Sequence, residues 1–203
     1  MGRTRREPRS GTADEIVAVV LDLLESDGYD AVQLRVVARR ARVSLATIYR
    51  RFATRDELIV TAIERWMTTR CYTDVAPPPP GETVYQGLMR VLRYVYEPWE
   101  RSPRILEAYH RCRIGPHGRR LDRQGMAVIA PAAEAVLAGA DPAYVADLGL
   151  VLRHVSYAVI GRFADGTLDI TEVLPTLERA VHLATANNER LATAAGERQA
   201  MQD

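Results

Sequence analysis

The segment from Gln33 to Arg55 constrains the fold most, because its apolar residues recur at helical spacing on both sides of a short break. The apolar residues before and after the break can each bury one face of a short helix. The same segment contains seven arginines and no acidic residue: Arg35, Arg39, Arg40, Arg42, Arg50, Arg51 and Arg55. A helix pair with an outer face of one charge sign is typical of binding to nucleic-acid phosphates. The alternative is a solvated helix face, although such faces usually mix both signs.

Capping residues predict where several of the N-terminal helices begin. Ser44 can accept a hydrogen bond from the backbone of the second helix of the pair, which is then expected over 45–52. Thr54 and Glu57 have the spacing of a capping box, which predicts another helix from residue 55. The same spacing recurs upstream at Thr12, so we expect the first helix to begin there.

The run 12–67 resembles the N-terminal domain of TetR-family transcriptional repressors. The resemblance rests on Gly28, Tyr29, Leu34, Val37, Ala38, Ala41, Val43, Ser44, Thr47, Ile48, Tyr49, Phe52 and the run from Arg55 to Leu58. Within the family, the segment is most similar to actinobacterial repressors of steroid-catabolism genes. The resemblance implies a homodimer that places one recognition helix of each protomer in the DNA major groove.

Three positions depart from the family pattern. The family usually has glycine where Arg42 stands, so a positive φ at Arg42 would carry strain of about 1 kcal/mol. A basic or polar residue is common where Leu45 stands, at the start of the recognition helix. Lysine is frequent where Arg55 stands, and arginine keeps the charge while offering two donors to a phosphate.

The residue types in this motif predict how it would contact DNA. We expect long polar and cationic side chains to hold phosphates, and the small or apolar first turn of the second helix to reach base edges and thymine methyl groups. Arg35, Tyr49, Arg50 and Arg55 belong to the first group, and Thr47 with its neighbours to the second. The predicted DNA-binding set is Arg35, Ser44, Leu45, Ala46, Thr47, Tyr49, Arg50, Arg51 and Arg55.

The positive charge is concentrated near the N-terminus. The net charge is only +1, yet the first 70 residues carry more arginine than acid and the remainder carry more acid than arginine. Residues 1–11 are rich in arginine and poor in apolar side chains, which predicts a disordered basic arm that lies along DNA or is simply solvated. The expected domains are this arm, a helix-turn-helix domain over 12–54, and a domain over 55–203 for dimerisation and effector binding.

Signatures of several other site classes are absent from the sequence. There is no glycine-rich phosphate loop, no zinc-ligand spacing and no paired acid–base constellation, so we expect no enzyme activity, no metal and no cofactor. Cys71 and Cys112 show no disulfide or metal framework, which favours a reduced cytoplasm. No stretch approaches the ~20 consecutive apolar residues of a membrane span, so no membrane partner is expected.

The sequence predicts an all-α protein: an N-terminal three-helix helix-turn-helix domain and a larger C-terminal helical regulatory domain. The proline run of Ala76–Gly81 should break the chain between helices. Pro131 should kink the helix that contains it. The expected helices beyond the motif are 55–72, which would connect the two domains, 82–97, 102–113, 118–138, 142–164 and 170–195.

Two of the expected helices carry apolar stripes suited to a dimer seam. The stripe on 142–164 follows a heptad pattern beside small residues, and the stripe on 170–195 could complete a four-helix seam with a second copy. The predicted interface is Val145, Leu148, Leu152, Val155, Val159, Leu177 and Val181. The alternative is that both stripes fill the core of the monomer.

A ligand pocket is predicted among the aromatic and apolar residues of the larger domain. The candidates are Tyr94, Trp99, Tyr109, Met126 and Tyr157, although aromatic residues at helical spacing more often form a core. Arginines also cluster between Arg101 and Arg123. They could meet an anionic effector such as an acyl-CoA thioester, or they could form a solvated surface.

The sequence therefore favours a transcriptional regulator, most simply a repressor, that binds a pseudo-palindromic operator as a homodimer. A small apolar or acyl-CoA-type effector would release it from DNA. One alternative is a DNA-binding protein that responds to no effector. The other is an all-helical enzyme acting on an anionic substrate, which the missing acid–base signature disfavours.

Overall fold

The computed structural model describes residues 10–71, 76–186, 188 and 191, and within these residues the chain is helical and contains no strand. The all-α prediction is confirmed. The expected arm over 1–11 lies almost entirely outside the described residues. The first part contains α1 (Ser10–Asp27), the 3-10 turn η1 (Tyr29–Ala31), α2 (Leu34–Arg40), α3 (Leu45–Tyr49), α4 (Arg55–Trp66) and the π-helical turn η2 (Met67–Cys71). The second contains α5 (Val84–Glu100), α6 (Pro103–Arg113), α7 (Gly118–Val136), α8 (Pro142–Ala164), the 3-10 turn η3 (Ile170–Glu172) and α9 (Val173–Thr185).

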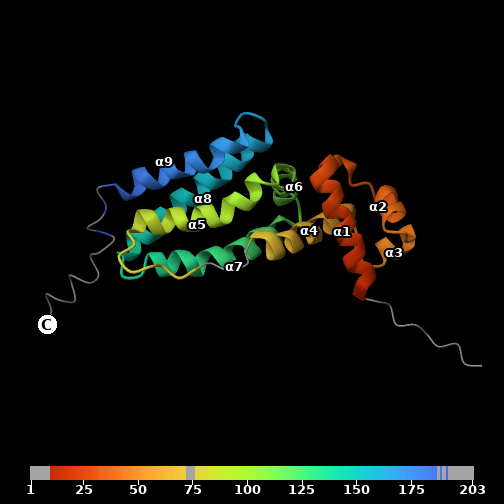
Figure 1. The fold of residues 1–203 in the computed structure, drawn as a ribbon, viewed down its shortest axis with the longest axis horizontal. Coiled ribbons are helices and arrows are strands. Elements are labelled where there is room, and N and C mark those ends of the chain that lie inside the picture. The colour runs from red at the N-terminus through yellow and green to blue at the C-terminus, as the bar shows by residue number, and fades with distance from the viewer. Residues whose placement is uncertain (1–9, 72–75, 187, 189–190, 192–203) are drawn as a thin grey trace, which may run out of the picture.

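The helices form an elongated molecule with a small head and a larger body (Figure 1). The head consists of α1, η1, α2 and α3, and the body consists of α5 to α9. Helix α4 leads from the head into the body, where it contacts α6 and α7. Helix α6 lies where the two parts meet and contacts α1 and η1 of the head as well as α5, α7 and α8 of the body.

One hydrophobic core continues from the head into the body. It includes Ile16 of α1, Ile63 and Trp66 of α4, Trp99 of α5 and Leu106 of α6, all nearly inaccessible to solvent. The ring centroids of Trp66 and Trp99 are 4.4 Å apart, which places the ends of α4 and α5 in direct contact. Because packed interiors transmit displacement, a shift of α4 or α6 must also move the head.

The predicted caps at Ser44 and Thr54 are present, and α8 has a further side-chain cap. Thr54 Oγ1 accepts a hydrogen bond from the backbone N–H of Glu57 at 3.0 Å, and α4 begins at the next residue as expected. Asp141 caps α8 through its side chain, and Pro142 occupies the first turn. Proline is suited to that position because the first N–H groups of a helix have no partner within it.

Some helix boundaries differ from the sequence-based expectation. Helix α1 already begins at Ser10, so the capping spacing at Thr12 lies inside a helix, and α3 ends at Tyr49. Helix α5 begins after Thr83, which forms a capping box with Gln86, and it continues through Pro98. Ends of helices are set by competing local bonds and are the least certain feature of any sequence prediction.

The last expected helix is divided in two. Residues 170–172 form η3, and α9 ends at Thr185. Asp169 explains the short first turn, because its side chain accepts hydrogen bonds from both the backbone N–H and the hydroxyl of Thr171. Most of the remaining expected range, to residue 195, lies outside the described residues.

Candidate nucleic-acid interface and internal cavity

The turn between α2 and α3 is fixed by hydrogen bonds at both of its ends. Val43 N–H donates to the Ala38 carbonyl at 3.0 Å and Arg42 N–H donates to the Arg39 carbonyl at 3.3 Å, which is the Schellman arrangement of a helix C-terminus. This arrangement needs a left-handed residue, and Arg42 has φ 54°. On the other side, Ser44 Oγ accepts from Thr47 N–H at 3.1 Å and starts α3.

This turn aligns an exposed cationic surface that belongs to α2, α3 and the residues beside them. Of the seven arginines in the segment, five are exposed: Arg35, Arg39, Arg40, Arg42 and Arg50. Arg40 lies 3.8 Å from Asp27, in a half-exposed pair that leaves most of this surface positive. We call these five side chains the arginine face.

The residues expected to read bases lie on the short helix α3. Ala46 and Tyr49 are exposed, with 56% of Tyr49 accessible to solvent, while Leu45 and Thr47 are partly buried. The only fully buried residue of α3 is Ile48, which holds the helix against the core of the head. The small side chains of Ala46 and Thr47 in the first turn of α3 suit close approach to a groove.

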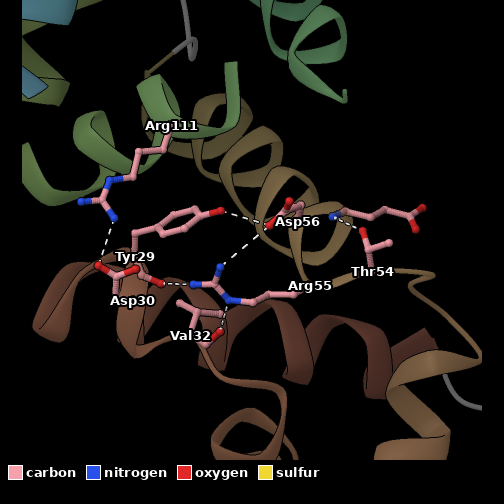
Figure 2. A network of polar contacts seen from close by, with 8 residues as sticks. Tyr29, Asp30, Val32, Thr54, Arg55, Asp56 and Arg111 are labelled. Atoms are coloured by element: carbon pink, nitrogen blue, oxygen red, sulfur yellow. Dashed lines mark hydrogen bonds and ion pairs between the residues drawn. The ribbon is translucent and has the colours of Figure 1, made fainter. Parts of the chain in front are cut away.

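Arg55 does not lie on the arginine face, which differs from the phosphate contact expected for it. Its Nε donates to the carbonyl oxygen of Val32 at 2.6 Å, and its Nη2 donates to the carbonyl oxygen of Tyr29. The guanidinium also lies over the Tyr29 ring, 4.3 Å from the centroid. Figure 2 shows the side chain pointing from the start of α4 toward η1, so it fixes α4 to the head.

Tyr29 is the centre of a polar network that joins the head to α6 (Figure 2). Its hydroxyl donates to Asp56 Oδ1 at 3.0 Å, and burial followed by this hydrogen bond raises the pKa of Tyr29 above its usual value. From α6, Arg111 Nη1 lies 3.0 Å from Asp30 Oδ2, and its guanidinium lies 5.3 Å from the centroid of the Tyr29 ring. Arg104, at the N-terminal end of α6, donates to the Ser26 carbonyl at the end of α1. The head is therefore tied to α6 by polar contacts as well as by the core.

The body contains a cavity of about 380 Å³ between α5, α6, α7 and α8. Most of its wall is aliphatic or aromatic, and its charged wall residues are Arg113, Asp122 and Arg153. The volume falls in the range of small-molecule pockets in proteins. Such a wall can enclose an apolar molecule and offers very few groups for polar recognition.

Three of the five residues expected in the pocket line this cavity: Trp99, Tyr109 and Met126. Tyr94 lies one position away from the lining face of α5, which is formed by Val91, Val95 and Trp99 at helical spacing. Tyr157 is exposed on α8, where its ring packs against the guanidinium of Arg113 at 4.7 Å. Residues four apart lie on one face of a helix, so stepping back from Trp99 in the sequence would have identified Val95 and Val91 as further cavity residues.

The arginines between Arg101 and Arg123 do not converge on one surface. Five of them bind partners on their own chain: Arg101 with Glu97, Arg104 with backbone carbonyls, Arg111 with Asp30 and Glu107, Arg113 with Asp122, and Arg120 with Glu64. Arg113 alone of the seven reaches the cavity. The structure therefore disperses the cluster that the sequence suggested as an anion site.

The stripes expected at a dimer seam are only partly on the surface. The structure buries Leu148, Val159, Leu177 and Val181 inside the chain, and Val145, Leu152 and Val155 are partly buried. These side chains belong to hydrophobic clusters within the single chain, as the alternative of a monomer core predicted. The large apolar side chains left exposed on the same two helices are Leu150 (56%), Val151, Tyr157 and Leu183 (76%).

Helix α8 is more apolar than we expected when we predicted that no segment approaches a membrane span. By length and composition it is the one helix among the described residues that could cross a membrane, and only 22% of its most apolar window is buried. That corrects the expectation that no segment approaches a membrane span. So large an exposed apolar surface is typical of a site that contacts another protein or a membrane.

Within the described residues no group of His, Cys, Asp and Glu side chains could hold a metal ion. Cys71 and Cys112 are both buried, and burial raises the pKa of each thiol, that of Cys112 to about 12. Such thiols remain protonated at neutral pH and are poor nucleophiles.

Two family models match the chain. The model of bacterial regulatory proteins of the tetR family matches residues 16–62, which include α2, α3 and most of α4. The model of the tetracyclin repressor-like C-terminal domain matches residues 81–184, which include the body helices and the cavity.

Relatives with known names are similar over part of their length. The HTH-type transcriptional repressor KstR of Rhodococcus jostii is 32% identical over 96 residues, which cover 47% of this chain and 44% of the relative. KstR of Mycolicibacterium smegmatis is 34% identical over 108 residues, covering 53% of this chain and 50% of the relative. The chain thus aligns with about half the length of each of these relatives.

Solved structures share the fold at low identity. A TetR transcriptional regulator from Rhodococcus sp. RHA1 superposes with a TM-score of 0.66 and 20% identity over 86% of this chain and 97% of that one. A TetR-like regulator from the same source gives a TM-score of 0.57 and 17% identity over 89% and 100%. Both likenesses concern the arrangement of helices.

Proposed function

The chain belongs to the TetR family of bacterial regulatory proteins, whose members are transcriptional regulators rather than enzymes, and from this we propose that it is a ligand-responsive repressor. In this proposal a cytoplasmic homodimer binds a pseudo-palindromic operator and leaves it when a small molecule occupies the body. The observation that carries the proposal is the arginine face, held beside a capped α3 in a head that is packed against α6.

The proposed DNA contacts divide between backbone and base edges. Arg35, Arg50 and Arg51, with the Tyr49 hydroxyl, would bind phosphates and set the register of the head. The first turn of α3, from Ser44 to Thr47, would face the bases, with the methyl groups of Ala46 and Thr47 suited to thymine. Arg55 would support this surface without contacting DNA, because it donates its hydrogen bonds to backbone carbonyls of the head.

A second copy is the proposed cover for the exposed apolar face of α8 and α9. Leu150, Val151 and Tyr157 on α8 and Leu183 on α9 are the side chains that support this proposal, since they are large, apolar and accessible in a single chain. Partner helices that pack there would form a four-helix seam, and the two heads would then contact half-sites separated by about one helical turn of DNA or a multiple of it.

Helix α6 is the proposed link between effector and operator. One side of it lines the cavity through Leu106, Tyr109 and Arg113, and the other holds the head through Arg104 and Arg111. A ligand that prefers a displaced α6 would favour a head spacing that no longer matches the operator. The dispersed arginines and the apolar wall favour a compact, largely apolar effector over a whole acyl-CoA thioester.

The experiment that tests the proposal is a gel-shift titration of the full chain against DNA from upstream of its own gene, over a salt series and with excess competitor DNA. We expect a discrete complex with a steep dependence on salt. Arg50→Ala should weaken binding and reduce the salt slope by about one unit, whereas Thr47→Ala should mainly relax sequence preference.

Arg119→Ala provides the matched control, because Arg119 is exposed on α7 of the body, far along the chain from the arginine face. It should leave both affinity and salt slope unchanged. Equal losses from Arg50→Ala and Arg119→Ala would contradict the proposed interface. Binding that competitor DNA abolishes at every salt concentration would contradict sequence-specific regulation.

A further inference from the structure

The cavity in the body has one polar end and one apolar end. Helices α5 and α7 run in opposite directions, with Gly87 near the start of α5 facing Val136 at the end of α7. At this end the wall is aliphatic and includes Leu88, Leu137 and Leu148. At the opposite end, beside α6, the wall contains Tyr96, Tyr109, Arg113 and Ser156. A molecule that matches the cavity must therefore be amphipathic.

Arg113 is the cation at the polar end, and only 15% of its side chain is exposed. Its Nε lies 2.5 Å from Asp122 Oδ1, and its guanidinium lies over the rings of Tyr157 at 4.7 Å and Tyr109 at 5.9 Å. No described residue accepts a hydrogen bond from its two terminal nitrogens. A guanidinium presents five N–H donors in a planar fork that matches a carboxylate, so this group is only partly satisfied by its protein partners.

The surrounding groups leave the polar end with excess positive charge. Asp122 is 44% exposed, so water weakens its hold on Arg113. Arg153 adds a second guanidinium at the rim of the cavity. Tyr96 and Ser156 contribute no charge, and burial keeps the pKa of Tyr96 and of Tyr109 above the usual value. The charged residues of the wall are thus two cations and one solvated carboxylate.

The backbone fixes this arrangement. Gly118 begins α7 so close to α6 that a Cβ on it would lie 1.8 Å from the carbonyl oxygen of Arg113. This close approach brings Asp122, one turn into α7, beside the last residue of α6. The position of Arg113 at the cavity is therefore a consequence of the α6–α7 turn rather than of a mobile surface side chain.

We propose that the cavity binds an amphipathic carboxylic acid, with its carboxylate on the terminal nitrogens of Arg113 and its hydrocarbon part extending toward Leu88 and Leu148. The inference deepens the proposed function, because it names the class of molecule that the ligand-responsive site takes. The carboxylate completes the fork that Asp122 fills only in part. The hydrocarbon gains by leaving water for the aliphatic end.

The two tryptophans of the chain provide a direct readout. Trp99 lines the cavity and Trp66 contacts it, so the intrinsic fluorescence of the protein reports on this site. We would titrate the full chain with matched pairs that differ only in the head group: dodecanoic acid and 1-dodecanol, 4-cyclohexylbutyric acid and 4-cyclohexyl-1-butanol, and 1-adamantaneacetic acid and 1-adamantaneethanol. Calorimetry would confirm each dissociation constant.

The expected result is that, in at least one pair, the acid binds about tenfold or more tightly than the alcohol. Arg113→Leu should weaken acid binding roughly ten- to a hundredfold and leave alcohol binding nearly unchanged. Asp122→Asn should act in the opposite direction and tighten acid binding, because it removes the competing carboxylate. Arg119→Leu, which removes an exposed charge from the same helix as Asp122, should change neither.

Several results would overturn the inference: equal binding of acid and alcohol in every pair, no binding of any acid, or acid binding that Arg113→Leu leaves intact. Gel shifts with the same molecules separate this failure from failure of the proposed function. If an alcohol releases DNA as readily as its acid does, the chain responds to an effector but does not require a carboxylate, which refutes the carboxylic-acid site. If an acid binds through Arg113 without any effect on DNA binding, the carboxylic-acid site is supported and the proposed effector response is refuted.

Discussion

Arg42 is the position where this chain departs from glycine in a turn that requires a positive φ. The residue occupies the left-handed position of the Schellman motif that ends α2, with φ 54°. A left-handed conformation costs an L-residue about 1–2 kcal/mol, and glycine avoids this cost. Glycine also gains about 0.4–1 kcal/mol of conformational freedom in the unfolded chain, which opposes the benefit. Arg42→Gly should therefore raise the free energy of unfolding by about 0.5–1 kcal/mol.

The measurement is denaturant and thermal unfolding at a fixed protomer concentration, where a gain of this size corresponds to a rise in Tm of about 2 °C. Arg42→Ala is the matched control, because it removes the same charge but keeps the Cβ that causes the strain. The alanine variant should gain little or nothing. Both variants should weaken DNA binding to the same extent, since both lose one charge from the arginine face.

A result in which Arg42→Ala stabilises the protein as much as Arg42→Gly would refute the reasoning, because the gain would then come from the lost side chain. A glycine variant no more stable than the wild type would also refute it. Separation of the two variants in stability but not in DNA binding is the outcome that supports a backbone origin.

Three further perturbations test the structure. Ser44→Ala should lower the free energy of unfolding by about 1 kcal/mol in denaturant titrations, since it removes the N-cap of α3; an unchanged midpoint would argue against that cap. Arg111→Met, which removes the ion pair with Asp30, should leave operator affinity nearly unchanged but raise the concentration of cavity ligand needed for half-release in a gel shift; an unaltered response would exclude this contact from the coupling. Hydrogen bonding to Arg90 lowers the pKa of Glu82 below its usual 4.5, so the pair stabilises the fold above that pH and this contribution is lost as pH falls through the lowered pKa. Glu82→Gln should therefore cost about 0.5–1 kcal/mol in unfolding experiments at pH 7 and progressively less in acid, and a cost independent of pH would contradict the assignment.

The features that sequence alone determined are those whose partners lie within a few residues of one another. The Ser44 cap bonds to Thr47, the Thr54 cap bonds to Glu57, and the turn at Arg42 closes within one helical turn. Each depends on a short run of the chain, so the residue types predict it directly. The cationic character of the segment is equally local, because no acidic residue interrupts it.

The side-chain placements that the sequence did not predict depend on contacts between distant segments. Arg55 leaves the arginine face because the carbonyls of Tyr29 and Val32 lie within its reach, and nothing in the local sequence indicates that. Tyr94 misses the cavity because the packing of α5 turns Val95 toward it instead. The arginines after residue 101 find acidic and carbonyl partners on α1, η1, α4 and α7, so charge counting alone suggested an anion site that the fold disperses.

Helix α8 shows the same limit most clearly. Its sequence is apolar on nearly every side, so its helical period predicts a helix but does not indicate which side meets the rest of the chain. The fold buries Leu148 and Val159 against the other helices of the body and leaves Leu150 and Val151 exposed. The sequence by itself determined that residues 142–164 form an apolar helix, because the helical period and its Asp141 cap are local. Only the tertiary structure decided its orientation, because that follows from the packing of helices distant along the chain, α6 and α9 among them.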